Sequence, residues 1–148
     1  MAAERLGWAE KAALGVEALI ALASVRLILH RTRPDAVLRR NRDVAALAMP
    51  RPDLAAQEHA CTAVARALPP LVRRVPWRAD CLVQALAGQR MLLRRGIASR
   101  IVVGTARHPD GRFESHAWLV CGESVVLGGD VARFDPLLGA PTKPPGAG

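Results

Sequence analysis

The chain has 148 residues, 51% of them hydrophobic, which predicts one domain with a substantial core and excludes a disordered protein. Its formal net charge is +8, nearly all from arginine, which favours acidic partners such as nucleic acid, anionic lipid or acidic peptides unless biased codon usage explains the arginines. Because the chain has only three Trp, two Phe and no Tyr, nucleic-acid binding on a stacking platform is not expected.

The first predicted element is a helix over residues 7–30. Glu10, Glu17 and Ser24 recur every seven residues and therefore share one face of this helix. The other faces are expected to be buried and carry Leu14, Leu19, Leu22, Val25 and Leu29. Charged residues interrupt the apolar stretch, and its longest uncharged run, residues 18–25, is far shorter than the ~20 residues of a membrane span. We therefore expect a helix of a soluble protein and no membrane association.

The next segments predict a connection and a second helix. Residues 30–43, "HRTRPDAVLRRNRD", are polar and basic and are typical of a connection with at most one helical turn, which Pro50 and Pro52 close. A helix is predicted over residues 53–68, ended by the proline pair at 69–70. Its apolar stripe contains Leu54, Cys61, Val64 and Leu68.

A third helix is predicted in "DCLVQALAGQRMLLRRG", residues 80–96. Asp80 stands at its start, basic residues fill its last turn, and Gly96 follows it, which is the expected polarity of helix signals. The internal Gly88 conflicts locally with a helix.

After this helix the pattern changes to strands. Residues 99–106, 113–121 and 125–127 are rich in apolar and β-branched side chains, and the turn sequences "HPDGR" and "GES" separate them. We predict an antiparallel meander of three strands, followed by a frayed Pro/Gly-rich tail over residues 136–148.

Cysteine and histidine fall where thiol chemistry needs them. Cys81 would lie in the first turn of the third helix, where unpaired N–H groups and the helix dipole favour a thiolate and can hold an oxyanion. His116 on a neighbouring strand could take the thiol proton. On a regular strand, Cys121 points away from His116 and is not the nucleophile. A zinc site is disfavoured, since no close ligand pair such as CxxC occurs among Cys61, Cys81, His116 and Cys121.

The acid that would orient the imidazole depends on the hairpin. A two-residue turn after Cys121 would pair His116 with Gly129, whereas a three-residue loop would place Asp130 opposite His116. A bulge at the glycine pair 128–129 could also re-aim Asp130. Asp130 is the first candidate, and Glu114 and Asp135 are the next.

The sequence "DCLVQALAGQRMLLRRGIASRIVVGTARHPDGRFESHAWLVCGESVV" resembles the transglutaminase-like leader peptidases of lasso-peptide biosynthesis, a class of RiPP maturation enzymes. The shared pattern is a cysteine before a leucine-rich helix, then "LLRRGI", an "IVVG" strand, and "HAW" before a hairpin, together covering residues 78–130. Cys81 matches the family's nucleophile, His116 its histidine and Asp130 its acid. The chain departs from the family where Gly122 and Glu123 replace the common Asp-Gly turn.

The resemblance implies an α+β, papain/transglutaminase-like fold in one domain, residues 1–135, with supporting helices over 1–70 and the catalytic core over 78–130. Helices fill the first half, which leaves no room for a leader-binding domain, so a separate leader-binding protein is expected to deliver the precursor peptide. An ATP-dependent lasso cyclase would take the product. No metal or other cofactor is needed. Two alternatives stay open, a transglutaminase-type acyl transferase and a non-catalytic peptide-binding module.

The cysteine content bears on the cellular location. The three cysteines are odd in number, contain no CxxC pair and follow no signal peptide. We therefore expect a reduced, cytoplasmic protein.

Overall fold

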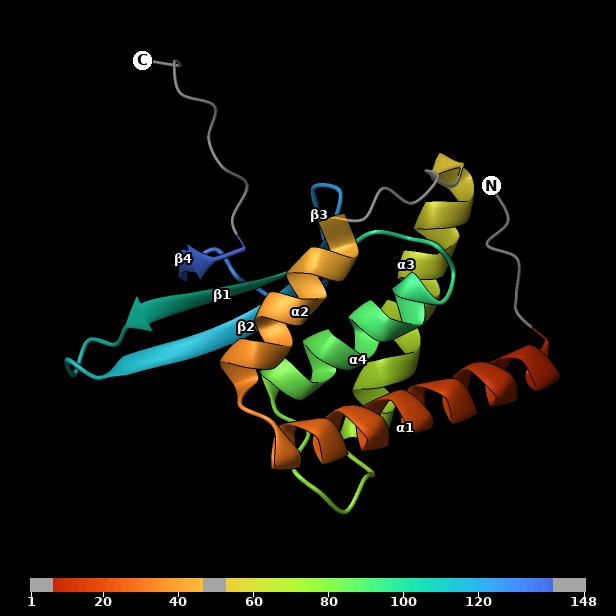
Figure 1. Ribbon diagram of the computed structural model, residues 1–148, viewed down its shortest axis with the longest axis horizontal. Coiled ribbons are helices and arrows are strands. Elements are labelled where there is room, and N and C mark those ends of the chain that lie inside the picture. The colour runs from red at the N-terminus through yellow and green to blue at the C-terminus, as the bar shows by residue number, and fades with distance from the viewer. Residues whose placement is uncertain (1–6, 47–52, 140–148) are drawn as a thin grey trace.

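A layer of helices lies against one face of an antiparallel sheet (Figure 1). The computed structural model describes residues 7–46 and 53–139. Within these ranges the helices are α1 (Trp8–Arg31), α2 (Pro34–Ala46), α3 (Leu54–Val72) and α4 (Cys81–Leu93). The strands are β1 (Arg100–Arg107), β2 (Phe113–Cys121), β3 (Ser124–Leu127) and β4 (Asp135–Leu138), in the order β3-β2-β1-β4. The predicted α+β fold is confirmed.

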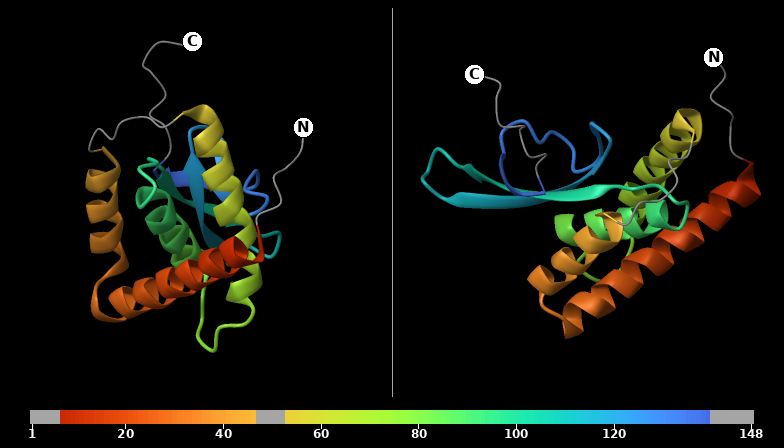
Figure 2. Two further views of the ribbon diagram at one scale, coloured as in Figure 1. Left: turned by 90° about the vertical axis from the view of Figure 1, so that its right-hand side faces the viewer. Right: turned by 45° about the horizontal axis from the view of Figure 1, so that its top comes forward.

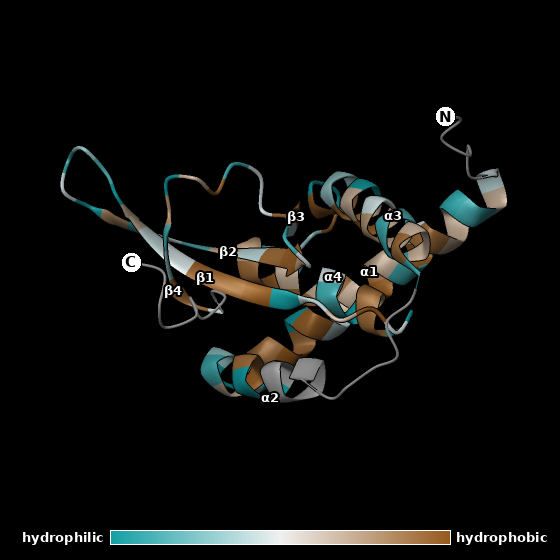
Figure 3. Cartoon of the chain, turned by 90° about the horizontal axis from the view of Figure 1, so that it is seen from above, coloured by the Kyte–Doolittle hydropathy of each residue, from teal (hydrophilic) through white to brown (hydrophobic). Residues whose placement is uncertain are grey.

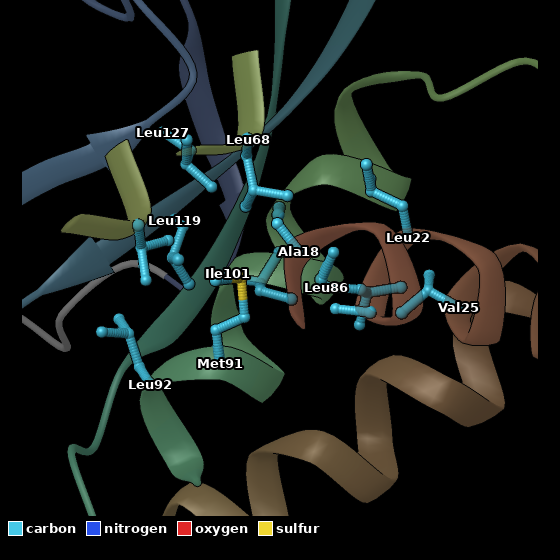
Figure 4. Close-up of a cluster of buried hydrophobic side chains, with 14 of the residues drawn as sticks. Ala18, Leu22, Val25, Leu68, Leu86, Met91, Leu92, Ile101, Leu119 and Leu127 are labelled. Carbon is cyan, nitrogen blue, oxygen red and sulfur yellow. The ribbon is translucent and has the colours of Figure 1, made fainter. Parts of the chain in front are cut away.

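The main core lies between α4, the inner face of α1, α3 and the sheet (Figure 4). It is built from aliphatic side chains that are almost completely buried, including Leu22, Leu68, Leu86, Met91 and Leu119. A smaller cluster on the opposite face of the sheet contains Val102, Trp118, Val120 and Phe134. The loop between β3 and β4 arches over that face (Figure 2, right), so both faces of the sheet are covered.

α1 has the predicted span but a different orientation. Glu17 from its polar face accepts two 2.7 Å hydrogen bonds from the Arg95 guanidinium, just beyond α4, so this face turns toward α4. Leu19, expected to be buried, is 40% exposed, and Val16 and Ile20 are more exposed still. Figure 3 shows α1 as hydrophobic over most of its length. Among the described residues, only α1 is long and apolar enough to cross a membrane, a property that core helices and signal sequences share.

The expected connection after α1 is wrong, because residues 34–46 form the helix α2. Pro34 at its first position and Asp35 in its first turn are favourable start signals. Arg39 donates a 2.8 Å hydrogen bond to Asp35 one turn earlier. Val37 and Leu38 pack against the main core, and this packing favours a helix in an otherwise polar segment. The prolines at 50 and 52 lie outside the described residues.

The predicted end of α3 is also wrong, because the helix continues through Pro69 and Pro70 to Val72. The two prolines cost at most two backbone hydrogen bonds in the final turns. Leu71 and Val72 pack against the core, which offsets that loss.

The tail predicted from Pro136 begins too early. Residues 135–138 form β4, which pairs antiparallel with β1 through Val103↔Leu138 and Thr105↔Asp135. β4 is an edge strand, the place in a sheet where proline is tolerated. The rest of the tail, from residue 140, lies outside the described residues.

Gly88 in α4 allows the sheet to pack directly on the helix. A Cβ at this position would lie 2.5 Å from Leu127 Cδ1 and 2.8 Å from Leu119 Cδ2. We expect Gly88→Ala to lower the free energy of unfolding by about 1–3 kcal/mol, because the core must move to admit the methyl group. Gly15→Ala is the matched control in α1, where no neighbouring atom lies within 4 Å. It should stabilise by about 0.5–1 kcal/mol. Urea denaturation measures both, and equal effects would contradict this account of Gly88.

Candidate active site

Cys81 and His116 line the same cavity, of ≈ 490 Å³. It lies where the start of α4, the last turns of α3, β2 and the edge of the sheet meet. The other residues that line it are Ala65, Pro69, Gln84, Ala117, Val125, Val126, Leu127, Gly128 and Gly129. Apart from Gln84, these are small or apolar, so the cavity presents few polar side chains that would compete with the thiol and the imidazole.

Cys81 is the first residue of α4 and is half-buried. The Asp80 carboxylate accepts a 3.1 Å hydrogen bond from the Val83 N–H, which confirms the predicted start of this helix. Gln84 Nε2 donates a 2.8 Å bond to the Ala79 carbonyl and thereby holds the chain entering the helix. The first-turn N–H groups of Cys81 and its successor have no acceptor within the helix, so they are suited to binding an oxyanion.

His116 is held by the loop that follows β3. Its Nε2 lies 2.8 Å from the Gly128 carbonyl oxygen, so Nε2–H donates and Nδ1 carries the free lone pair. The imidazole stacks on Phe134 with ring centroids 4.9 Å apart, and on Trp118 at 6.1 Å. The Arg133 guanidinium covers the Phe134 ring at 4.4 Å. One carbonyl and two aromatic rings therefore fix the plane and the tautomer of His116.

Strand parity is as predicted for β2. Ala117, Leu119 and Cys121 pack in the main core beside α4, whereas His116 lies with Trp118 on the opposite face. In the described part of the chain, no hydrogen bond joins the Cys81 thiol to His116. The structure therefore brings Cys81 and His116 to one cavity without a hydrogen bond between them. Catalytic hydrogen bonds often tighten only when substrate binds.

Asp130 takes part in a turn. It is exposed, and its Oδ1 accepts a 3.1 Å hydrogen bond from the Ala132 N–H. Within the described ranges it makes no hydrogen bond to His116, whose Nε2 partner is instead the carbonyl of Gly128. A direct role for the carboxylate stays a prediction. The geometry gives Asp130 a structural task, because its turn shapes the loop that carries both Gly128 and Phe134.

The hairpin begins with the two-residue turn that was one of the expected possibilities, which pairs Cys121 with Ser124. The bulge lies earlier than the glycine pair where it was expected, because Val120 faces Val125 whereas Leu119 faces Leu127. Gly128 and Gly129 follow with positive φ values of 130° and 70°, which side chains rarely adopt. The glycine pair thus turns the chain out of the sheet and aims the Gly128 carbonyl at His116.

Glu114 and Asp135, the next candidates for the acid, do not contact His116 in the described part of the chain through any hydrogen bond. Arg133 Nη1 lies 2.8 Å from Glu114 Oε2, and this close guanidinium holds the pKa of Glu114 below its usual value. His108 lies 3.5 Å from the same oxygen. Asp135 opens β4, is exposed and pairs with β1. Neither carboxylate lines the cavity that holds His116. Glu114 instead forms an ion pair with Arg133, the residue before Phe134.

The remaining cysteines, Cys61 and Cys121, lie outside the cavity that holds Cys81, the first of them partly buried and the second buried. Burial, with a smaller contribution from the neighbouring Cys121 thiol, raises the pKa of Cys61 to about 12. Cys121 is buried and its Sγ donates to the Ala98 carbonyl at 3.6 Å. The described residues contain no group of three or more His, Cys, Asp or Glu arranged to hold a metal ion.

Phe134 is the site residue that sequence reasoning missed. It follows the hairpin in a segment without strand periodicity, and nothing local marks it as a neighbour of His116. Only the path of the loop across the sheet brings the two rings together. Its aromatic character, rare in this chain, was the one available signal.

The chain matches a known protein family. The family model of the transglutaminase-like superfamily matches residues 14–139, a range that contains Cys81, His116 and Asp130. No curated protein and no solved structure matches the chain significantly.

Proposed function

The chain belongs to the transglutaminase-like superfamily, and from this premise we propose that it is a cysteine peptidase that removes the leader from a lasso-peptide precursor. Superfamily membership supports thiol-based acyl transfer in general. The observation that carries the proposal is that Cys81, at the start of a helix, and His116 line the same cavity. The resemblance of residues 78–130 to lasso leader peptidases supports the choice of substrate.

In the proposed reaction the Cys81 thiol gives its proton to Nδ1 of His116, the nitrogen that Gly128 leaves free. The sulfur then attacks the carbonyl carbon at the leader–core junction, and the first-turn N–H groups of α4 stabilise the oxyanion. His116 returns the proton to the leaving amine as the C–N bond breaks, and the core peptide departs with a free amino group. Water, deprotonated by His116, hydrolyses the thioester and releases the leader with a new carboxylate.

Asp130 acts, in this proposal, as a positioning residue. Its turn with Ala132 sets the course of the loop that brings Gly128 and Phe134 to His116. No metal or nucleotide enters the proposed steps. The cellular setting we propose is the cytoplasm, in company with a leader-binding protein and the cyclase that uses the released core peptide.

We expect the isolated chain to cleave its precursor poorly until the separate leader-binding protein is added. The cavity is large enough for a few residues around the scissile bond but not for a whole leader. Tethering the precursor through a second protein raises the effective concentration of that bond at Cys81, to the order of millimolar for a short flexible connection. The measurement is the cleavage rate of full-length precursor with and without the partner, over a range of substrate concentrations.

Two controls make this experiment decisive. Cys81→Ala with the partner present gives the uncatalysed background. Mass analysis of the product separates hydrolysis, which leaves a new amino terminus, from transfer to an amine, which leaves a cross-link. Equal rates with and without the partner would show that the chain recognises the leader unaided.

A further inference from the structure

The two edges of the sheet differ in how they are protected against pairing. β4, at one edge, carries Asp135 and Pro136, and charge and proline both discourage the addition of another strand. β3, at the other edge, reads Ser-Val-Val-Leu without a charge or a proline. Val125 on β3 is 43% exposed. An unprotected apolar edge is a ready site for an extended peptide.

The open edge of β3 faces the candidate active site. The three β3 residues 125–127 line the cavity that holds Cys81 and His116, as do the two glycines that follow the strand. Val125 lies opposite Val120 on one face of the sheet, whereas Val126 and Leu127, at the bulge, pack toward the main core on the other face. Side chains from both faces can line one cavity only if the edge of the strand faces it. The cavity is therefore bounded by the N–H and C=O groups of this strand as well as by side chains.

The register shows which backbone groups are available. Gly122, with φ +59°, and Glu123 form a two-residue turn, so Cys121 and Ser124 close the hairpin as a hydrogen-bonded pair. The next pair, Val120↔Val125, is then of the non-hydrogen-bonded type. Val125 accordingly directs its N–H and C=O away from β2 and toward the cavity.

The wall opposite β3 is made of small residues of α3. Ala65 and Pro69 lie one helical turn apart and line the cavity. Because Pro69 has no N–H, the Ala65 carbonyl lacks its α-helical donor. Ala117 also lines the cavity, so the pocket beside the strand admits small apolar side chains.

We infer that the edge of β3 binds the substrate as an added strand, with Val125 pairing to the peptide backbone and a small apolar side chain directed toward Ala65 and Pro69. This inference rests on the proposed function and names how that site holds an extended peptide with alternating small apolar residues. The scissile bond would then lie where the strand passes Cys81 and His116 at the glycine pair.

Peptide binding tests this in a form that requires no catalysis. The Cys81→Ala chain, labelled with ¹⁵N, is titrated with the blocked peptide acetyl-Val-Ala-Val-Ala-Val-Ala-amide. We expect saturable shifts of the backbone amides of residues 125–129. Methylation of the peptide nitrogens at all valines, or at all alanines, should weaken binding at least about tenfold in one peptide only, because every second N–H of a strand faces its partner. Equal effects of both methylations, or no saturable shift at these residues, would overturn the inference.

A pair of variants gives an independent check. Val125→Pro removes the outward N–H without removing a β2–β3 hydrogen bond, and should lose the same tenfold or more in affinity. Val125→Thr keeps the N–H and the branched shape and should bind like the unchanged residue. Equal binding by both would contradict the inference, and the methylated peptides decide the matter if the proline variant does not fold. If the peptide binds but Cys81 of the unchanged chain does not react with iodoacetamide, the proposed peptidase activity would be refuted. The inference that the edge of β3 binds an extended peptide would still hold.

Discussion

We expect replacement of Cys81 with alanine to abolish precursor cleavage, with a loss on the order of a thousandfold or more. The thiol forms the covalent bond to the leader, and the described cavity offers no second nucleophile of comparable strength. Serine at the same position should be nearly as inactive, since a hydroxyl is a far weaker nucleophile than a thiolate. The measurement is product formation by mass spectrometry with the leader-binding protein present.

Thiol labelling tests the same assignment without the precursor. At neutral pH iodoacetamide should modify Cys81 first, because it lies in an open cavity at a helix start. Cys61 should react slowly, since its pKa is raised to about 12 and few of its thiols ionise near pH 7. Cys121 is buried and should be protected. Mass mapping that finds Cys61 or Cys121 modified ahead of Cys81 would refute the assignment of the nucleophile.

The features of the fold that the sequence could predict are those that depend on residues close together in the chain. Asp80 caps α4, and Gly96 after it has the positive φ of 69° that favours glycine, so the position of Cys81 at a helix start followed from neighbouring residues alone. The period-2 pattern likewise placed His116 and Cys121 on opposite faces of β2. Such features depend on a few consecutive residues and therefore survive without knowledge of the fold.

The parts that it missed depend on contacts made at a distance. α2 is a polar segment held in place by Val37 and Leu38 in the core, and α3 extends past Pro70 for a similar reason. β4 is a short edge strand that pairs with β1, a partner distant in the sequence. In each case tertiary packing outweighs the local signal, which a single sequence does not reveal.

The same reasoning applies within the site. The partner of His116 Nε2 is a main-chain carbonyl, and every residue has one, so no residue type could mark Gly128 in advance. The atom that contacts the imidazole belongs to Gly128, in the loop that also contains Asp130. A role of the Asp130 carboxylate in orienting His116 stays a prediction.

Substitutions at His116 and Asp130 separate these roles. His116→Ala should abolish cleavage as fully as loss of Cys81, because the imidazole moves the proton in both half-reactions. It should also slow iodoacetamide labelling of Cys81, because the imidazole that accepts the thiol proton is gone. The measurements are the cleavage rate and the rate of Cys81 labelling in the variant and in the unchanged chain. An unchanged labelling rate would mean that His116 does not act on the thiol.

Substitution of Asp130 should weaken the enzyme by loosening the turn that this residue forms. The carboxylate accepts the Ala132 N–H, and the loop so formed carries Gly128 and Phe134 to His116. Asp130→Ala removes this acceptor and should lower the cleavage rate by about three- to tenfold, since one hydrogen bond contributes about 1 kcal/mol net. Asp130→Asn keeps an oxygen in the same place and should retain most of the rate. If both variants lose activity equally, the negative charge itself orients the imidazolium, and Asp130 is a member of the catalytic triad rather than a support for its loop.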